Sequence, residues 1–196
     1  MATPLDEHSL DQLFRTARSY NGYTEQPVEE ADLHAIWELM KFGPTSANMM
    51  PARIIWVRSS EAKERLAALA SENNSDKIRS APVTAIIGMD MAFYDHLPEL
   101  FPPADARSWF VGNEPLIETS ALRNSSLQGA YLIIAARALG FDTGPMSGFD
   151  NAGVDAVFFA GTTVKSNFIC TLGHGDPATI FERLPRPPFE RFNRIV

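Results

Sequence analysis

The sequence predicts an α+β fold built around one central sheet. Helical patterns outnumber strand patterns along the 196 residues, and the two do not strictly alternate, as they would in a doubly wound parallel fold. A chain of this length can remove roughly 70% of its unfolded surface from water. The 45% hydrophobic and 21% charged fractions are those of an ordinary globular protein. We therefore expect residues 1–196 to form a single domain with a substantial core.

Two helices are predicted before the first strand. Apolar residues recur at helical spacing over residues 6–18, with Asp6 or Ser9 as the possible cap, and Asn21-Gly22 stops the pattern. A second helix opens at residues 27–30, and Gly43-Pro44 ends it. The predicted apolar face of this second helix is Leu33, Ile36, Trp37 and Met40.

Two apolar runs rich in β-branched residues, 54–57 and 83–87, predict buried strands, with a helix over 61–70 between them. The Pro-containing segment 93–106 has no clear period, and we expect it to shape substrate access. The longest helix is predicted over 116–139, with Gly140 as its cap. Its predicted buried face is Ala121, Leu122, Leu127, Gln128, Tyr131, Leu132, Ala135 and Leu139.

The C-terminal third continues with a Gly/Pro-rich turn, a helix, a strand and an arm. The turn is residues 144–150, the helix is expected over 151–159, and the buried strand over 167–172. Residues 177–196 contain Pro185, Pro187 and Pro188. We expect this arm not to close on itself.

Composition argues against several classes of partner. The net charge is −7 with a pI near 5.1, so no positive field attracts nucleic acid. Because no segment is long and apolar enough to span a bilayer and no leader is recognisable, we expect a cytoplasmic protein with no membrane partner. The single cysteine, Cys170, lies in an apolar run and is expected to be buried and inert.

The sequence argues against three other kinds of site: a dinucleotide-binding site, a metal site and a serine hydrolase site. Residues 173–178 nearly match the glycine-rich dinucleotide fingerprint, but too little chain follows for the rest of the βαβ unit. The four histidines lack metal-ligand spacing, so we expect no metal. Ser147 lies outside a G-x-S-x-G motif, which makes a serine hydrolase improbable.

Four polar loops remain: residues 18–21, 44–48, 74–77 and 145–148. Their order and spacing resemble the FMN-dependent nitroreductase family. Segments 107–110, 123–126, 144–150 and 165–167 resemble its RutE-type malonic semialdehyde reductase branch. The resemblance covers nearly the whole chain. It implies a nitroreductase-like fold, with a mostly antiparallel sheet flanked by helices, and a homodimer with FMN at the interface and the C-terminal arm crossing to the partner.

The resemblance also implies residues for the phosphate end of FMN. Arg18, Ser19 and Asn21 are expected to contact the phosphate, the ribityl chain and the ring edge. Arg183 is expected to hold the phosphate, and Arg186 is an alternative to it. A planar guanidinium fork matches a phosphate dianion, although surface salt bridges are the simpler explanation for Arg18 and Arg183.

For the flavin ring, the resemblance implies three further groups. Ser46 and Asn48 approach it from the other subunit, unless they only form a helix-capping turn. Asn74 and Lys77 lie near N1 and O2, unless Lys77 is a solvated lysine beside Asp76. The turn formed by Pro145, Met146, Ser147 and Gly148 presents the backbone N–H of Ser147 or Gly148 to N5.

Two positions depart from the family pattern. Asn21 stands where many members carry a basic residue, and Ala52 stands where many carry the tryptophan of a Gln-Pro-Trp sequence. Loss of the tryptophan leaves more open volume beside the ring. Loss of the basic residue transfers its electrostatic role to Lys77.

The implied activity is an FMN-dependent NAD(P)H oxidoreductase that transfers hydride through flavin N5, without a side-chain nucleophile. The implied acceptor is malonic semialdehyde, reduced to 3-hydroxypropionate in pyrimidine degradation, with Arg53, Arg107 or Arg123 pairing with its carboxylate. The sequence leaves the choice of NADH or NADPH open. The alternatives are a broad nitroreductase or quinone reductase, and a non-catalytic flavin-binding or scaffold protein.

Overall fold

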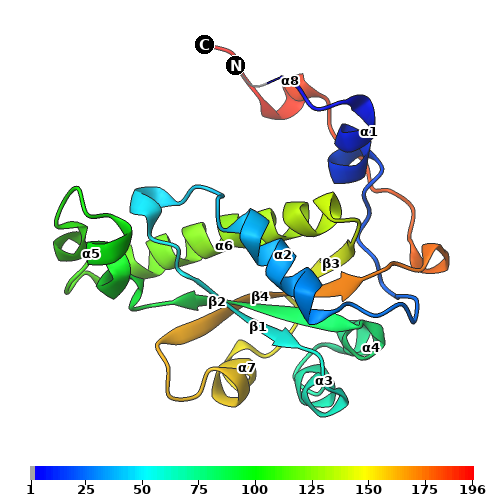
Figure 1. The fold of residues 1–196 in the computed structure, drawn as a ribbon, viewed down its shortest axis with the longest axis horizontal. Helices are drawn as coiled ribbons and strands as arrows, with labels where there is room; N and C mark the ends of the chain where they lie inside the picture. Colours follow the sequence, from blue (N-terminus) through cyan, green and yellow to red (C-terminus); the bar gives the residue numbers. More distant parts are fainter. Residues whose placement is uncertain (1–2) are drawn as a thin grey trace.

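A four-stranded antiparallel sheet forms the centre of the computed structural model, which describes residues 3–196 (Figure 1). Its strands are β1 (Ala52–Val57), β2 (Val83–Asp90), β3 (Asp142–Met146) and β4 (Val164–Gly173), in the order β1-β2-β4-β3. The β2–β4 register shifts at a bulge between Ile87 and Gly88. The α+β prediction and the mostly antiparallel sheet are confirmed.

Helices cover both faces of the sheet (Figure 1). On one face, α2 (Glu30–Met40) and α6 (Glu114–Ala138) share a buried cluster with β2 and β4. On the other face, α3 (Ser60–Ala67), α4 (Glu72–Ser80) and α7 (Asn151–Phe158) share a second cluster that contains Ile86 and Ile169. Neighbouring residues of β2 point to opposite faces, so the strand is buried on both sides, as its continuous apolar run predicts.

A third buried cluster lies at one end of α6. The segment after β2 folds into η3 (Phe93–His96), α5 (Leu97–Leu100) and η4 (Ala106–Trp109). Phe93 and Leu97 are fully buried there against Ile117 and Ala121 of α6. The segment is therefore anchored by a buried cluster of its own. Its sequence has no regular apolar period, so this cluster was not predicted.

The remaining short elements lie near the two ends of the chain and in the loop after α2. They are α1 (Glu7–Leu10), η1 (Asp11–Arg15), η2 (Ser46–Asn48), η5 (Pro177–Thr179) and α8 (Phe189–Phe192). The C-terminal arm, orange to red in Figure 1, runs along the N-terminal segment instead of packing on the sheet. Within residues 3–196, no helix combines the length and the apolar character needed to cross a membrane.

The buried face of α6 differs from the predicted one. Leu122 and Leu127 are exposed, at 46% and 40%, while Asn124, Ser125 and Gln128 are buried. Gln128 Oε1 accepts a hydrogen bond from Ala52 N at 2.8 Å, and Asn124 Oδ1 accepts one from Ser46 N at 2.9 Å. These amides accept hydrogen bonds from backbone N–H groups of neighbouring segments. Polar residues therefore lie on the buried face of α6, and the leucines lie on its exposed face.

Four other local expectations were wrong. The first helical segment continues from α1 as a π-helix and ends at Arg15, so it does not reach Arg18. Residues 74–77 belong to α4, not to a loop, and residues 144–146 belong to β3, not to a turn. Trp37 of α2 is 37% exposed.

Gly129 gives a direct test of the packing between α6 and the sheet. A Cβ at this position would lie 2.3 Å from Cζ of Phe168, on β4. We expect Gly129→Ala to destabilise the fold, because overpacking costs about 1–3 kcal/mol, which exceeds the gain of up to about 1 kcal/mol from helix propensity. Urea unfolding measures the difference, and Ala130→Gly at the exposed neighbouring position calibrates the propensity. A Gly129→Ala protein at least as stable as the wild type would contradict this packing.

Candidate functional site

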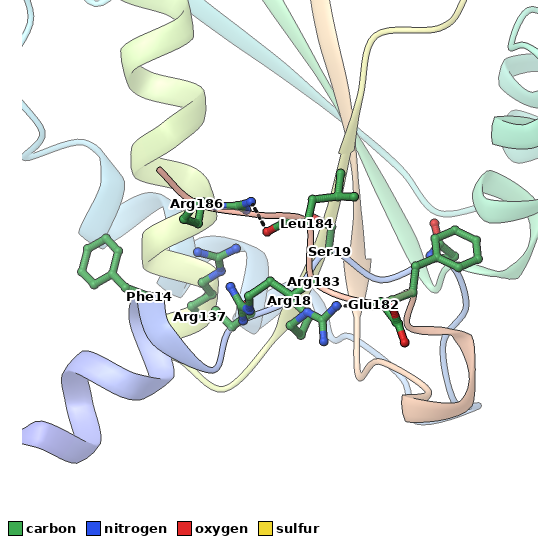
Figure 2. A pocket seen from close by; sticks show the side chains of 11 residues that line it. Phe14, Arg18, Ser19, Arg137, Glu182, Arg183, Leu184 and Arg186 are labelled. Carbon is green, nitrogen blue, oxygen red and sulfur yellow. Dashed lines mark hydrogen bonds between the residues drawn. The ribbon is translucent and has the colours of Figure 1, made fainter. Parts of the chain in front are cut away.

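A cavity of about 600 Å³ lies between the N-terminal segment, the end of α6 and the C-terminal arm. We call it the arginine pocket, because four of its lining residues are Arg18, Arg137, Arg183 and Arg186 (Figure 2). The rest of its lining is Phe14, Ala17, Ser19, Asn21, Phe181, Glu182 and Leu184. One carboxylate thus faces four guanidinium groups, in a chain whose net charge is −7. Such a local excess of positive charge attracts an anion.

Hydrogen bonds between the arm and the N-terminal segment position two of these arginines. Arg183 donates to the carbonyl oxygens of Arg15 and Ala17 at 2.9 and 3.0 Å, and Arg18 donates to the carbonyl oxygen of Phe181. Over residues 3–196, neither arginine forms a salt bridge with a carboxylate. A surface ion pair therefore does not explain them, and their remaining N–H donors are available to a ligand.

Asn21 forms a second attachment between the N-terminal segment and the C-terminal arm. Its Nδ2 donates to the carbonyl oxygen of Thr179 at 2.9 Å, and Gly22 N donates to Thr179 Oγ1 at 3.1 Å. The arm is therefore attached to residues 15–22 at several points between Thr179 and Arg183. Ser19 lies between the two attachments and lines the pocket.

Strand β3 runs from the arginine pocket to a turn at Ser147 and Gly148, which directly follow Pro145 and Met146 of the strand. Ser19 pairs with Thr143 in a parallel bridge, and Tyr20 N donates to the Thr143 carbonyl at 3.1 Å. A Cβ on Gly144 would lie 2.5 Å from the carbonyl oxygen of Tyr20, so this close approach requires glycine. Thr143 and Ser147 are four strand steps apart, about 13 Å. That separation is of the order of the length of FMN.

The turn after β3 offers free backbone donors. Neither Ser147 N–H nor Gly148 N–H donates to an acceptor within residues 3–196. The carbonyl of Gly148, in contrast, accepts from Ser71 N at 2.9 Å and from Asn74 Nδ2 at 3.0 Å. Both partners lie at the start of α4, which therefore fixes the turn from one side.

Lys77 lies one turn further along α4. Its neighbour Asp76 pairs with Arg79, with 3.3 Å between Oδ1 and Nη1. Lys77 itself is half-buried and has no salt bridge in the described part of the chain. Its ammonium is therefore free for an anion, and the alternative of a solvated lysine beside Asp76 stays open.

Ser46 and Asn48 lie away from the arginine pocket, on the loop between α2 and β1. Asn124 of α6 holds Ser46 N, and Asn48 Nδ2 donates to the Leu100 carbonyl at 2.9 Å. Ala47 and Asn48 have φ of 46° and 49°, in the left-handed region that is unfavourable for residues other than glycine. Strained loops of this kind are frequent at functional sites.

The three arginines proposed for the substrate also lie apart from the pocket. Arg53 pairs with the buried carboxylate of Asp90 at 2.7 Å, and Arg107 pairs with Asp95 at 2.8 Å. Arg123 is exposed on α6 and forms no salt bridge in residues 3–196. It precedes Asn124, whose side chain accepts a hydrogen bond from Ser46 N. Of the three, Arg123 therefore has the guanidinium that is least engaged by the chain.

Arg137 is a pocket residue that the sequence did not single out. It interrupts the apolar C-terminal half of α6, and burial lowers the pKa of its guanidinium. A charged residue in an apolar helix was the available signal, but helical spacing alone does not show which cavity such a residue faces.

The Nitroreductase family model matches residues 14–174. The chain belongs to the nitroreductase family. A nitroreductase relative from Burkholderia lata, named "Putative NADH dehydrogenase/NAD(P)H nitroreductase", is 62% identical over 98% of this chain and 99% of its own. A relative from Ralstonia pickettii with the same name and the suffix HadB is 59% identical, over 93% of this chain and 95% of its own.

Solved structures show the same nitroreductase fold at low sequence identity. The YdfN protein of Bacillus subtilis superposes with a TM-score of 0.86 at 21% identity, covering 97% of this chain and 100% of its own. A protein of Exiguobacterium sibiricum, solved in complex with FMN, superposes with a TM-score of 0.84 at 22% identity, covering 100% and 99%. The nitroreductase-like fold is thereby confirmed.

Proposed function

We propose that this nitroreductase is a cytoplasmic FMN-dependent NAD(P)H oxidoreductase. The observation that carries the proposal is that β3 joins a cluster of arginines to a turn with free N–H groups, about one FMN length away. The names of the relatives, which refer to NAD(P)H nitroreductase, support the same activity. The Exiguobacterium neighbour, solved with FMN, supports the choice of cofactor.

The donors along β3 fit the chemistry of FMN from one end to the other. Arg18, Ser19 and Arg183 suit the phosphate dianion, and the amide of Asn21 suits the hydroxyl groups of the ribityl chain. Donors for the ring come from the backbone N–H groups of Ser147 and Gly148, which follow Pro145 and Met146 of β3, and from Asn74 and Lys77 on α4. When bound, FMN passes hydride from the nicotinamide to the acceptor through its N5 atom.

Each group of the chain then has a defined task. The N–H of Ser147 or Gly148 orients the ring by donating toward N5, whatever the side chain at 147. Lys77 provides positive charge near N1 and O2, where negative charge accumulates on reduction. Its ammonium stabilises the reduced cofactor, a task that Asn21 cannot share because it is uncharged.

The active form that we propose is a homodimer with the cofactor at its interface. Many large apolar side chains are exposed on the single chain, and exposed apolar surface, where it is contiguous, marks an interaction site. They lie on the first helical segment, on and after α2, on α6, and on the arm: Phe14, Leu39, Phe42, Leu116, Leu122, Leu127, Phe181, Leu184, Phe189, Phe192 and Ile195. We expect an obligate interface above roughly 2,000 Å², with the arm crossing to the partner and the Ser46–Asn48 loop reaching the partner's cofactor.

The acceptor that we propose is malonic semialdehyde, reduced to 3-hydroxypropionate in pyrimidine degradation, as in the RutE-type branch. Its carboxylate requires a cation, and Arg123 is the best candidate of the three arginines. Arg53 and Arg107 have carboxylate partners already, at 2.7 and 2.8 Å. Arg123 adjoins the loop that is proposed to approach the other subunit's cofactor.

A second candidate is a broad reductase of nitro compounds or quinones, which the names of the relatives favour. Such acceptors carry no carboxylate, so they do not depend on Arg123. A protein that binds flavin without turnover is a third outcome of the following experiment.

Anaerobic spectroscopy tests these alternatives. We expect the FMN-loaded protein to bleach with NADH or NADPH and to regain its colour with the acceptor, fastest with malonic semialdehyde. Arg123→Ala is expected to raise KM for the acidic aldehyde at least about tenfold, with no change for a nitroaromatic compound, because a charge-assisted contact contributes about 1.5–3 kcal/mol. Equal reoxidation by all acceptors identifies the broad reductase, and bound flavin that neither NADH nor NADPH bleaches identifies the non-catalytic protein.

A further inference from the structure

We propose that Arg137 is a third phosphate-binding guanidinium of the cofactor site, and that it selects the phosphorylated flavin over riboflavin. This inference rests on the proposed function, since it assigns a new residue to the phosphate end of that site. Arg137 comes from the last turn of α6, whereas Arg18 and Arg183 come from the two ends of the chain. The phosphate is then bound from three separate segments.

The side chain of Arg137 is fixed from the N-terminal side. Its Nη1 donates to the Leu13 carbonyl at 2.9 Å, and its own carbonyl accepts from Gln12 Nε2 at 2.7 Å. Both contacts involve the first helical segment, so the guanidinium is oriented before any ligand arrives. Figure 2 shows it with Arg18, Arg183 and Arg186 around the same opening.

One donor of this oriented group is unsatisfied. Nε of Arg137 is buried and has no hydrogen-bond partner within residues 3–196. A buried donor without a partner is unfavourable, and more so on a charged group. An anion in the pocket compensates the charge of the guanidinium, which explains why this cation is tolerated in an apolar part of the helix.

The carboxylates nearby do not pair with this guanidinium in the described part of the chain. Asp142 is half-buried, but its Oδ2 accepts from Gly175 N at 2.9 Å, and it lies beyond salt-bridge distance of Arg137. Glu182 lines the pocket from the arm and pairs with none of its four arginines. The pocket therefore has three more guanidinium groups than carboxylates, and a phosphate dianion neutralises most of that excess.

The decisive measurement is the ratio of FMN to riboflavin affinity, from titrations of the apoprotein followed by flavin fluorescence. We expect Arg137→Gln to weaken FMN binding about 30-fold and to leave riboflavin binding within about twofold, because only FMN carries the phosphate. Arg137→Lys keeps the charge without the planar fork, and we expect an intermediate loss.

Two controls separate this effect from misfolding and from a change in net charge. Unchanged riboflavin affinity reports an intact ring site in each variant. Arg65→Gln, on α3, removes the same charge from a side chain that also donates to one backbone carbonyl, that of Val157. We expect it to leave both affinities unchanged.

Each outcome has a defined meaning. A wild-type protein that binds neither flavin overturns the proposed function and this inference with it. A wild-type protein that binds FMN, with Arg137 variants that keep the wild-type ratio or lose both flavins equally, overturns the role of Arg137 alone. The same holds if the variants weaken NADPH binding relative to NADH at an unchanged flavin ratio, since the 2′-phosphate of NADPH is then the anion bound by Arg137.

Discussion

Arg183→Ala is expected to weaken FMN binding by about two orders of magnitude, because charge-assisted hydrogen bonds contribute about 1.5–3 kcal/mol each and tenfold in affinity is 1.4 kcal/mol. Arg183 acts in two ways. It faces the pocket, and it holds the arm on the N-terminal segment through the carbonyls of Arg15 and Ala17. Its removal therefore takes away one donor to the phosphate. It also removes two hydrogen bonds that attach the arm, which lines the pocket, to the N-terminal segment.

Equilibrium dialysis against FMN measures this loss. Arg191→Ala is the matched control, because Arg191 lies on the same arm, outside the pocket, and its guanidinium stacks on the ring of Phe192. Arg183→Lys is expected to fall between the wild type and Arg183→Ala. Wild-type affinity in Arg183→Ala would remove the arm from the cofactor site.

Gly148→Val is expected to reduce FMN affinity at least about tenfold, a loss of about 1.4 kcal/mol. A Cβ at Gly148 would lie 2.8 Å from Asn74 Nδ2 and 2.9 Å from Ser71 Oγ. The Asn74 side chain can turn aside only by giving up its bond to the Gly148 carbonyl. Valine also adds two methyl groups that screen the neighbouring N–H from the ring.

The neighbouring Ser147 provides the control for Gly148→Val. The Ser147 side chain is exposed, and the proposed contact is through its backbone, so Ser147→Ala is expected to bind FMN within about twofold of the wild type. Fluorescence titration compares the two variants, and circular dichroism verifies that both are folded. Equal affinities would show that the turn does not contact the ring.

The elements that were predicted well are those with a clear apolar period. The helices α2 and α7 and the strands β1, β2 and β4 were placed within a few residues, because their apolar residues face one of the two buried clusters of the sheet. Helix α4 was missed because eight of its nine residues are polar or charged and only Ile78 is buried. Strand β3 was missed because Gly144 and Pro145 are typical of turns.

The site shows the same limit of sequence reasoning. Arg18, Ser19, Asn21 and Arg183 meet in one pocket, although the order of the loops, rather than any single motif, pointed to them. Arg137 was missed because its role depends on where the end of α6 lies relative to the arm. The leucines of α6 were assigned to the core because helical spacing does not distinguish a buried apolar face from an exposed one.

The central claim is that the arginine pocket and the segment from the end of β3 to Gly148 bind the two ends of one FMN in a dimer. Gel filtration with light scattering and a full absorption spectrum, after incubation with excess FMN, tests it most directly. We predict a yellow species of twice the 21.7 kDa chain mass that retains about one FMN per chain, as one pocket per chain requires. A colourless protein that elutes at the mass of one chain would contradict the account.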